Sequence, residues 1–118
     1  MFRIRRIFDD IAPVNRQTLE QASVLLKEQF NGLKPEKIDR ISNVLKHPIK
    51  YGFRTILYVA EDNLFRLQGL ALLDHDADLS FFFLDYLTSQ PSMGGRGIGA
   101  ALYDRVRGEA LSLGVTGI

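Results

Sequence analysis

The stretch Ser89-Gln90-Pro91-Ser92-Met93-Gly94-Gly95-Arg96-Gly97-Ile98-Gly99-Ala100 decides how the rest of this sequence is interpreted. Four of these residues are glycines within six positions, and glycine allows backbone conformations and close approaches that a side chain prevents. An apolar run over 79–87 precedes the stretch, and an amphipathic helical pattern over 98–113 follows it. The first N–H groups of a helix lack intrahelical acceptors and carry partial positive charge. A strand, a glycine loop and a helix N-terminus therefore predict a cradle for an anion, most often phosphate.

The composition limits the class of protein. With 118 residues the chain is long enough for one core, so we interpret 1–118 as a single domain. A formal net charge of +1 gives no reason to expect nucleic acid or a membrane surface as partner. No apolar run reaches membrane-spanning length, and the basic start has no signal-peptide core after it. Cysteine is absent, which excludes disulfides and thiolate chemistry and fits a cytoplasmic protein.

Hydrophobic periodicity predicts the N-terminal half. Alternation over 2–8 predicts a strand whose arginines decorate a solvated face. Apolar residues at steps of three and four predict a helix that begins near Pro13 and stops at Asn31-Gly32. A second amphipathic helix is predicted to start at Pro35 and to end before Pro48.

The C-terminal half predicts a meander of three strands and then a helix. The strands are expected over 53–60, 65–73 and 79–87, with turns at 61–63 and 74–77. The last of them is apolar on both faces, so it should be central and covered on both sides. The helix over 98–113 ends at Gly114, and a further strand begins at 115–118. The order β-α-α-β-β-β-α-(β) indicates an α/β (mixed α+β) fold with a central, mostly antiparallel sheet flanked by helices.

Two well-known kinds of phosphate loop fit the glycine loop poorly. A P-loop ends in Gly-Lys-Ser/Thr, whereas here the run is Gly97-Ile98-Gly99. A dinucleotide fingerprint is expected in a parallel βαβ unit with an acidic residue ~20 positions further on. This loop instead follows a predicted antiparallel meander, and the sequence ends before that position. A plain strand-to-helix turn remains open, although one or two glycines would suffice for it.

From 53 to 115 the sequence resembles the GCN5-related N-acetyltransferase (GNAT) superfamily. The resemblance is carried by 57–62, 68–73, 83–87 and 91–102, which look like the second, third and fourth strands, the acyl-CoA loop and its helix. The family motif Gln/Arg-x-x-Gly-x-Gly/Ala falls on 94–99. Gly94 departs from it, because the family prefers Gln or Arg there, and Ser89 stands where valine is commoner.

The resemblance implies that acetyl-CoA is the acyl donor, with its pyrophosphate on backbone N–H groups and its pantetheine arm paired with the end of the preceding strand. The residues expected to bind it are Leu87, Thr88, Ser89, Gly94, Gly95, Arg96, Gly97, Ile98, Gly99 and Ala100. The implied reaction is direct attack of an amine on the thioester. The family fold continues beyond its fifth strand, so we expect a truncated chain. A homodimer or a partner chain would then cover the open sheet edge.

Other side chains give weaker signals. Asp85 is the carboxylate within the 79–87 run, on the predicted face of Phe81, Phe83 and Leu87, and is a candidate general base. The alternative is a structural role, in which the Asp85 carboxylate pairs with an arginine or caps a neighbouring backbone group. The acidic residues at 74–78 are interpreted as a turn, and no metal is expected. Two alternative functions stay open: a non-catalytic acyl-CoA-binding regulatory module or part of a larger protein, and an interaction domain that has lost its ligand.

Overall fold

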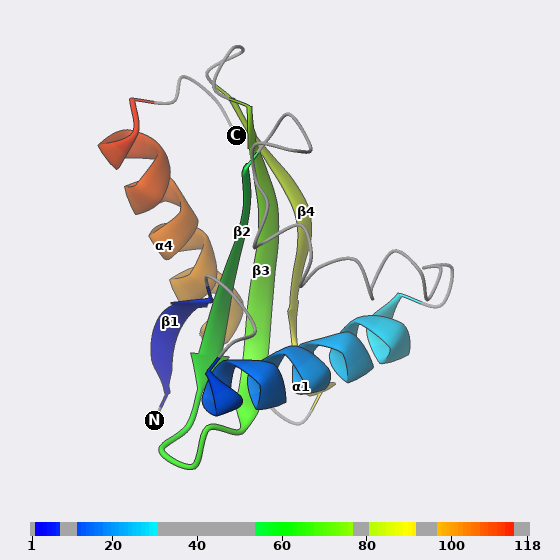
Figure 1. Ribbon diagram of the computed structural model, residues 1–118. Helices are drawn as coiled ribbons and strands as arrows, with labels where there is room; N and C mark the ends of the chain where they lie inside the picture. The colour runs from blue at the N-terminus through cyan, green and yellow to red at the C-terminus, as the bar shows by residue number, and fades with distance from the viewer. Residues whose placement is uncertain (1, 8–11, 31–53, 77–80, 92–96, 115–118) are drawn as a thin grey trace.

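The computed structural model describes residues 2–7, 12–30, 54–76, 81–91 and 97–114, which form one sheet and two helices (Figure 1). The elements in chain order are β1 (Arg3–Ile7), α1 (Pro13–Gln29), β2 (Arg54–Glu61), β3 (Leu67–Asp76), β4 (Phe81–Ser89) and α4 (Ile98–Ser112). The four strands form an antiparallel sheet in the order β1-β2-β3-β4. The predicted helix after Pro35 and the predicted strand at 115–118 lie outside the described residues. Neither described helix is long and apolar enough to cross a membrane.

The two helices cover opposite faces of the sheet. Successive residues of a strand point to opposite sides, so alternate residues pack under different helices. In β2, Leu57 and Val59 pack in the cluster under α1, whereas Ile56 and Tyr58 pack in the cluster under α4. Figure 1 shows α1 in front of the strands and α4 beside and behind them. The mixed α+β class with a mostly antiparallel sheet and helices on both sides is confirmed.

Helix α1 begins and ends for local reasons that the sequence shows. Pro13 occupies the first turn, where its missing N–H has no intrahelical acceptor to lose. Its buried face comprises Thr18, Leu19, Ala22, Leu25 and Leu26. The helix ends one residue before Phe30, whose N–H still donates to the Leu26 carbonyl at 2.9 Å. The predicted stop at Asn31-Gly32 lies outside the described residues.

Helix α4 lies against the sheet through one residue in every four. Its buried side chains are Ile98, Leu102, Val106 and Ala110. The helix ends at Ser112, and Gly114 takes a left-handed φ of 70°, as the predicted glycine stop requires. Leu113, the last residue of the predicted helix 98–113, is the C-cap residue instead and is 43% exposed.

Both predicted turns of the meander are wrong in their first residues. Glu61 is the last residue of β2 and is fully buried, and β3 continues through Asp74 to Asp76. The physical reason is that each carboxylate has a partner distant in sequence. Glu61 binds Arg5, and the Asp74 carboxylate accepts a hydrogen bond from the Thr55 hydroxyl directly opposite at 2.9 Å. Acidic residues can extend a strand when a neighbouring strand supplies the donor.

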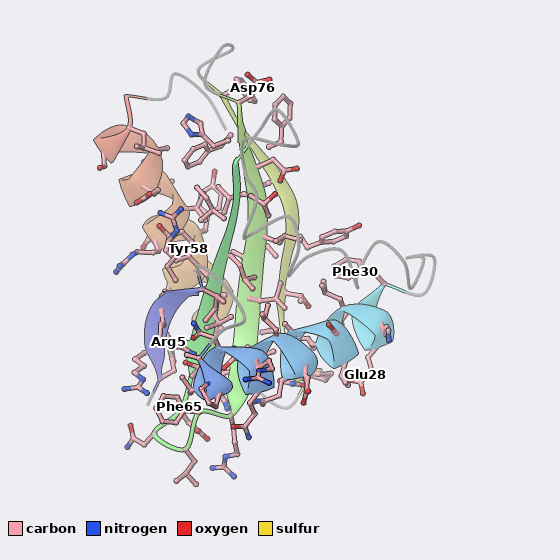
Figure 2. All side chains as sticks on the ribbon, in the orientation of Figure 1. Arg5, Glu28, Phe30, Tyr58, Phe65 and Asp76 are labelled. Carbon is pink, nitrogen blue, oxygen red and sulfur yellow. The ribbon has the colours of Figure 1, made fainter. Side chains whose placement is uncertain are left out.

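Arg3 of β1 is exposed as expected, but the expected solvated face is wrong for Arg5 and Arg6. Arg5 points to the α1 side and donates to both carboxylate oxygens of Glu61, at 2.9 and 3.3 Å. The same carboxylate accepts from the Thr18 hydroxyl at 2.8 Å, and Arg5 also donates to Thr18 and to Asn15. Figure 2 shows Arg5 where β1 meets the start of α1. We name this set of four residues the α1-side network.

Arg6 makes the corresponding contact on the other face. Its guanidinium lies 3.1 Å from the Glu109 carboxylate of α4, and Glu109 also hydrogen-bonds the Tyr58 hydroxyl. Arg105, one helical turn before Glu109, donates a hydrogen bond to the same hydroxyl, and its guanidinium lies over the Tyr58 ring. Burial first, and then the charge of Glu109, raise the pKa of Tyr58 above its ordinary value. We name these four residues the α4-side network; it fixes α4 to the strands.

Strand β4 departs from its predicted description in two ways. It was expected to be central, but among the described residues it pairs only with β3 and lies at the edge of the sheet. Its register also shifts: Leu84 faces Leu73 and Tyr86 faces Leu72, which leaves Asp85 as an extra residue in a β-bulge. The bulge reverses the alternation, so Leu87 packs on the α4 side with Phe82 and does not share a face with Phe81 and Phe83 as predicted.

Candidate functional site

The end of β4 and the start of α4 lie side by side over one residue of β3. Ser89, the last residue of β4, faces Gly69, and the Gln90 N–H beyond it donates to the Gln68 carbonyl at 2.8 Å. Ile98, the first residue of α4, packs against the same glycine. The two segments that the sequence predicts to form one site are therefore brought together on β3, where both lie against Gly69.

The start of α4 offers backbone donors that have no acceptor among the described residues. Gly97 is the N-cap residue with a left-handed φ of 75°, a conformation that favours glycine. The first intrahelical hydrogen bond runs from the Ala101 N–H to the Gly97 carbonyl at 3.0 Å. The N–H groups of Ile98, Gly99 and Ala100 therefore have no acceptor inside the helix. The N-cap supplies no side-chain hydrogen bond, and the first turn contains no acidic residue, so the positive end of the helix dipole is available to an anion.

The space around this turn is open. A Cβ added to Gly97 or to Gly99 would meet no atom within 4 Å. Gly97 is explained by its backbone angle, but Gly99 has neither a left-handed φ nor a close neighbour among the residues that the structure describes. Glycine inside a helix costs roughly 1 kcal/mol relative to alanine. The packing of the described residues gives no reason for Gly99, whereas a ligand that must approach the backbone closely would.

The structure places the predicted binding residues in two groups. Leu87, Thr88 and Ser89 are the last three residues of β4, where Leu87 packs against the core under α4. Gly97, Ile98, Gly99 and Ala100 form the N-cap and first turn of α4. The loop residues Gly94, Gly95 and Arg96 lie outside the described residues.

Asp85, the predicted general base, is the extra residue of the bulge in β4, four positions before Ser89. Bulges are frequent beside active sites, where they redirect a strand. Its role as a base stays a prediction. Within the part of the chain that the structure describes, no three His, Cys, Asp or Glu side chains gather where they could hold a metal ion.

Gly69 is the residue that sequence reasoning left without a role. Its signal was present, because a glycine inside a strand often marks the close approach of another backbone. The sequence does not say which element approaches, since Ile98 lies far along the chain.

Comparison with known proteins identifies the fold. By sequence the chain matches no family model and no curated protein. By structure it is similar to Tetrahymena GCN5, with a TM-score of 0.79 at 14% identity over 96% of this chain. It is also similar to AAC(6')-Iy in complex with a CoA-containing bisubstrate analogue, with a TM-score of 0.71 at 17% identity over 99% of this chain. A third similar structure is the N-acetylglutamate synthase of Neisseria gonorrhoeae with coenzyme A and N-acetylglutamate (TM-score 0.63, 19% identity, 98% of this chain).

These similarities extend over nearly the whole chain, so its fold is the GNAT fold. The chain covers 66% of Tetrahymena GCN5, 76% of AAC(6')-Iy and 24% of the Neisseria synthase. Identities below 20% define the architecture and not the reaction.

Proposed function

We propose that this chain binds acetyl-CoA at the start of α4 and the end of β4, and that it transfers the acetyl group to an amine. The observation that carries the proposal is the first turn of α4, with unpaired N–H groups, a left-handed Gly97 and open space at Gly99. A diphosphate is the anion that such a turn accommodates best, because backbone donors and the helix dipole act on it together. The solved structures with coenzyme A and with a CoA analogue support the same choice of ligand.

The binding residues in this proposal are the predicted ones. The diphosphate lies on the N–H groups of the loop 94–96 and of Gly97, Ile98, Gly99 and Ala100. The pantetheine amides pair with the backbone of Leu87, Thr88 and Ser89, as a short added strand would. This pairing uses the edge of β4 that faces away from β3.

The acyl transfer forms one bond and breaks one. The neutral amine attacks the thioester carbonyl carbon, the C–N bond forms, and the C–S bond then breaks. A base takes the proton that the amine loses, and the CoA thiolate leaves and is protonated. Asp85 is the proposed base. An unchanged pH–rate profile in Asp85→Asn would show that it is not.

Two glycines of α4 provide a matched test of binding. Gly99→Ala and Gly108→Ala both add a methyl group where no protein atom lies within 4 Å, so both should stabilise the free protein by up to roughly 1 kcal/mol. We expect Gly99→Ala to weaken acetyl-CoA binding by about tenfold or more, and Gly108→Ala to leave it unchanged. Titration calorimetry measures the affinities, and thermal melting measures the stabilities.

The wild-type result separates the candidate functions. Acetyl-CoA at about 100 times its Kd should add roughly 2.7 kcal/mol to the free energy of unfolding. No shift at millimolar acetyl-CoA contradicts the proposal and favours an interaction domain. Binding without release of free CoA thiol on a panel of amines favours the non-catalytic CoA-binding module.

The outer edge of β4 before Leu87, which the pantetheine arm leaves free, is a proposed interface with a second copy of the chain or with another chain. Among the described residues this edge has no strand partner, and the nine residues of β4 include one charged side chain. Such an edge pairs readily with another strand. Light scattering across a concentration series tests this, and a monomer at every concentration contradicts the self-pairing form.

A further inference from the structure

Gly69 is the one described glycine that sterically excludes a side chain. Its φ is not left-handed, so its conformation does not require glycine. A Cβ built there would lie 2.7 Å from Ile98 Cγ2, 2.9 Å from the Thr88 carbonyl oxygen and 3.3 Å from Ser89 Cα. Contacts below 3.0 Å do not occur for real Cβ atoms, so an alanine would have to displace its neighbours.

The three neighbours come from the two elements that border the candidate site. Ile98 is the first residue of α4 and is 2% exposed, so its side chain has little room to move. Thr88 and Ser89 end β4, and the clash there is with backbone atoms. The hydrogen bond from Gln90 to Gln68 holds the chain close to β3 immediately after β4. Gly69 is therefore in contact with both borders at once.

We infer that Gly69 is a positioning residue for the CoA site: the absence of its side chain sets the separation between the start of α4 and the end of β4. This inference rests on the proposed function, since it concerns how one CoA molecule reaches both borders. The diphosphate binds the first turn of α4 and the pantetheine arm binds β4. The two halves of the ligand are covalently joined, so the distance between their binding surfaces must match the ligand. A methyl group at Gly69 moves one surface relative to the other and leaves each surface chemically unchanged.

Two probes separate positioning from a general loss of structure. CoA spans both surfaces, whereas ADP carries the diphosphate but no pantetheine arm. In Gly69→Ala we expect the affinity for CoA to fall by about tenfold or more, equivalent to about 1.4 kcal/mol, and the affinity for ADP to change by less than about twofold. Gly108→Ala is the control, because its added methyl group meets no atom within 4 Å.

If Gly69→Ala does not fold, Ile98→Ala tests the same contact from the other side. It removes the Cγ2 atom nearest to Gly69 and keeps the backbone N–H, so the CoA affinity should change while the ADP affinity does not. Equal loss of CoA and ADP binding in the variants overturns the inference, and so does unchanged CoA binding. Failure of the wild-type chain to bind CoA overturns the proposed function itself, so the two failures are distinguishable.

Discussion

Arg5 and Arg6 are neighbours in β1, yet they belong to two networks on opposite faces of the sheet with different surroundings. In the α1-side network the Glu61 side chain is fully buried, and Arg5 is 26% exposed. In the α4-side network the side chains of Arg6 and Glu109 are 19% and 24% exposed. Each network contains an arginine of β1 and a glutamate, but Glu61 belongs to β2 and binds α1 through Thr18, whereas Glu109 belongs to α4 itself. The difference in exposure determines how much stability is lost when one partner is removed. A charge in contact with water stays solvated without its partner, whereas a buried charge does not.

The largest effect is expected from Arg5→Met. The change leaves the buried Glu61 carboxylate without a cation, and breaking a buried pair in this way costs about 3–5 kcal/mol. Urea denaturation measures the loss in the free energy of unfolding. The double variant Arg5→Met, Glu61→Leu should recover most of it, since an apolar pair of similar volume removes the unpaired charge. A double variant no more stable than the single one would contradict this account.

Arg6→Met is the matched change on the other face, and we expect a smaller loss of roughly 1 kcal/mol. Glu109 keeps its contact with water and its hydrogen bond to the Tyr58 hydroxyl. The same denaturation series measures it. If Arg6→Met costs as much as Arg5→Met, exposure of the carboxylate does not explain the difference between the two networks.

Tyr58→Phe tests the α4-side network through the pH dependence of the free energy of unfolding. At neutral pH the variant loses about 1 kcal/mol with the hydroxyl's hydrogen bonds. In the folded protein the pKa of Tyr58 is raised above the ordinary tyrosine value of 10.0, so the unfolded chain loses this proton first as pH rises. The stability that Tyr58 contributes is therefore complete below pH 10 and declines above it. Denaturation at neutral and alkaline pH should show the gap between wild type and variant narrowing as pH rises. A stability difference that widens as pH rises would contradict a raised pKa of Tyr58.

Much of this fold follows from local signals in the sequence. Pro13 starts α1 and Gly114 follows α4, while the alternation over 2–8 and the β-branched and aromatic residues over 53–60 predict two strands. The sequence also predicted that the end of β4 and the start of α4 share a site, because the glycine-rich stretch lies between them.

The errors involve contacts between residues that are distant in the sequence. Glu61 was assigned to a turn because it precedes Asp62-Asn63, and its partner Arg5 stands 56 residues away. The contact between Gly69 and Ile98 is likewise determined by how the helix docks on the sheet. Local pattern cannot reveal a neighbour that only the fold supplies.

The bulge at Asp85 has a consequence for anyone who aligns this chain with others. Before Asp85, residues with even numbers face α4, as Phe82 and Leu84 do; after it, Leu87 does. A residue-by-residue alignment with an unbulged strand would therefore equate side chains from opposite faces of the sheet over the last residues of β4. At sequence identities of 14–19% a one-residue misalignment of these few residues would not noticeably lower the identity of the alignment. Comparison of catalytic positions along this strand needs a one-residue gap at Asp85 wherever the relative lacks the bulge.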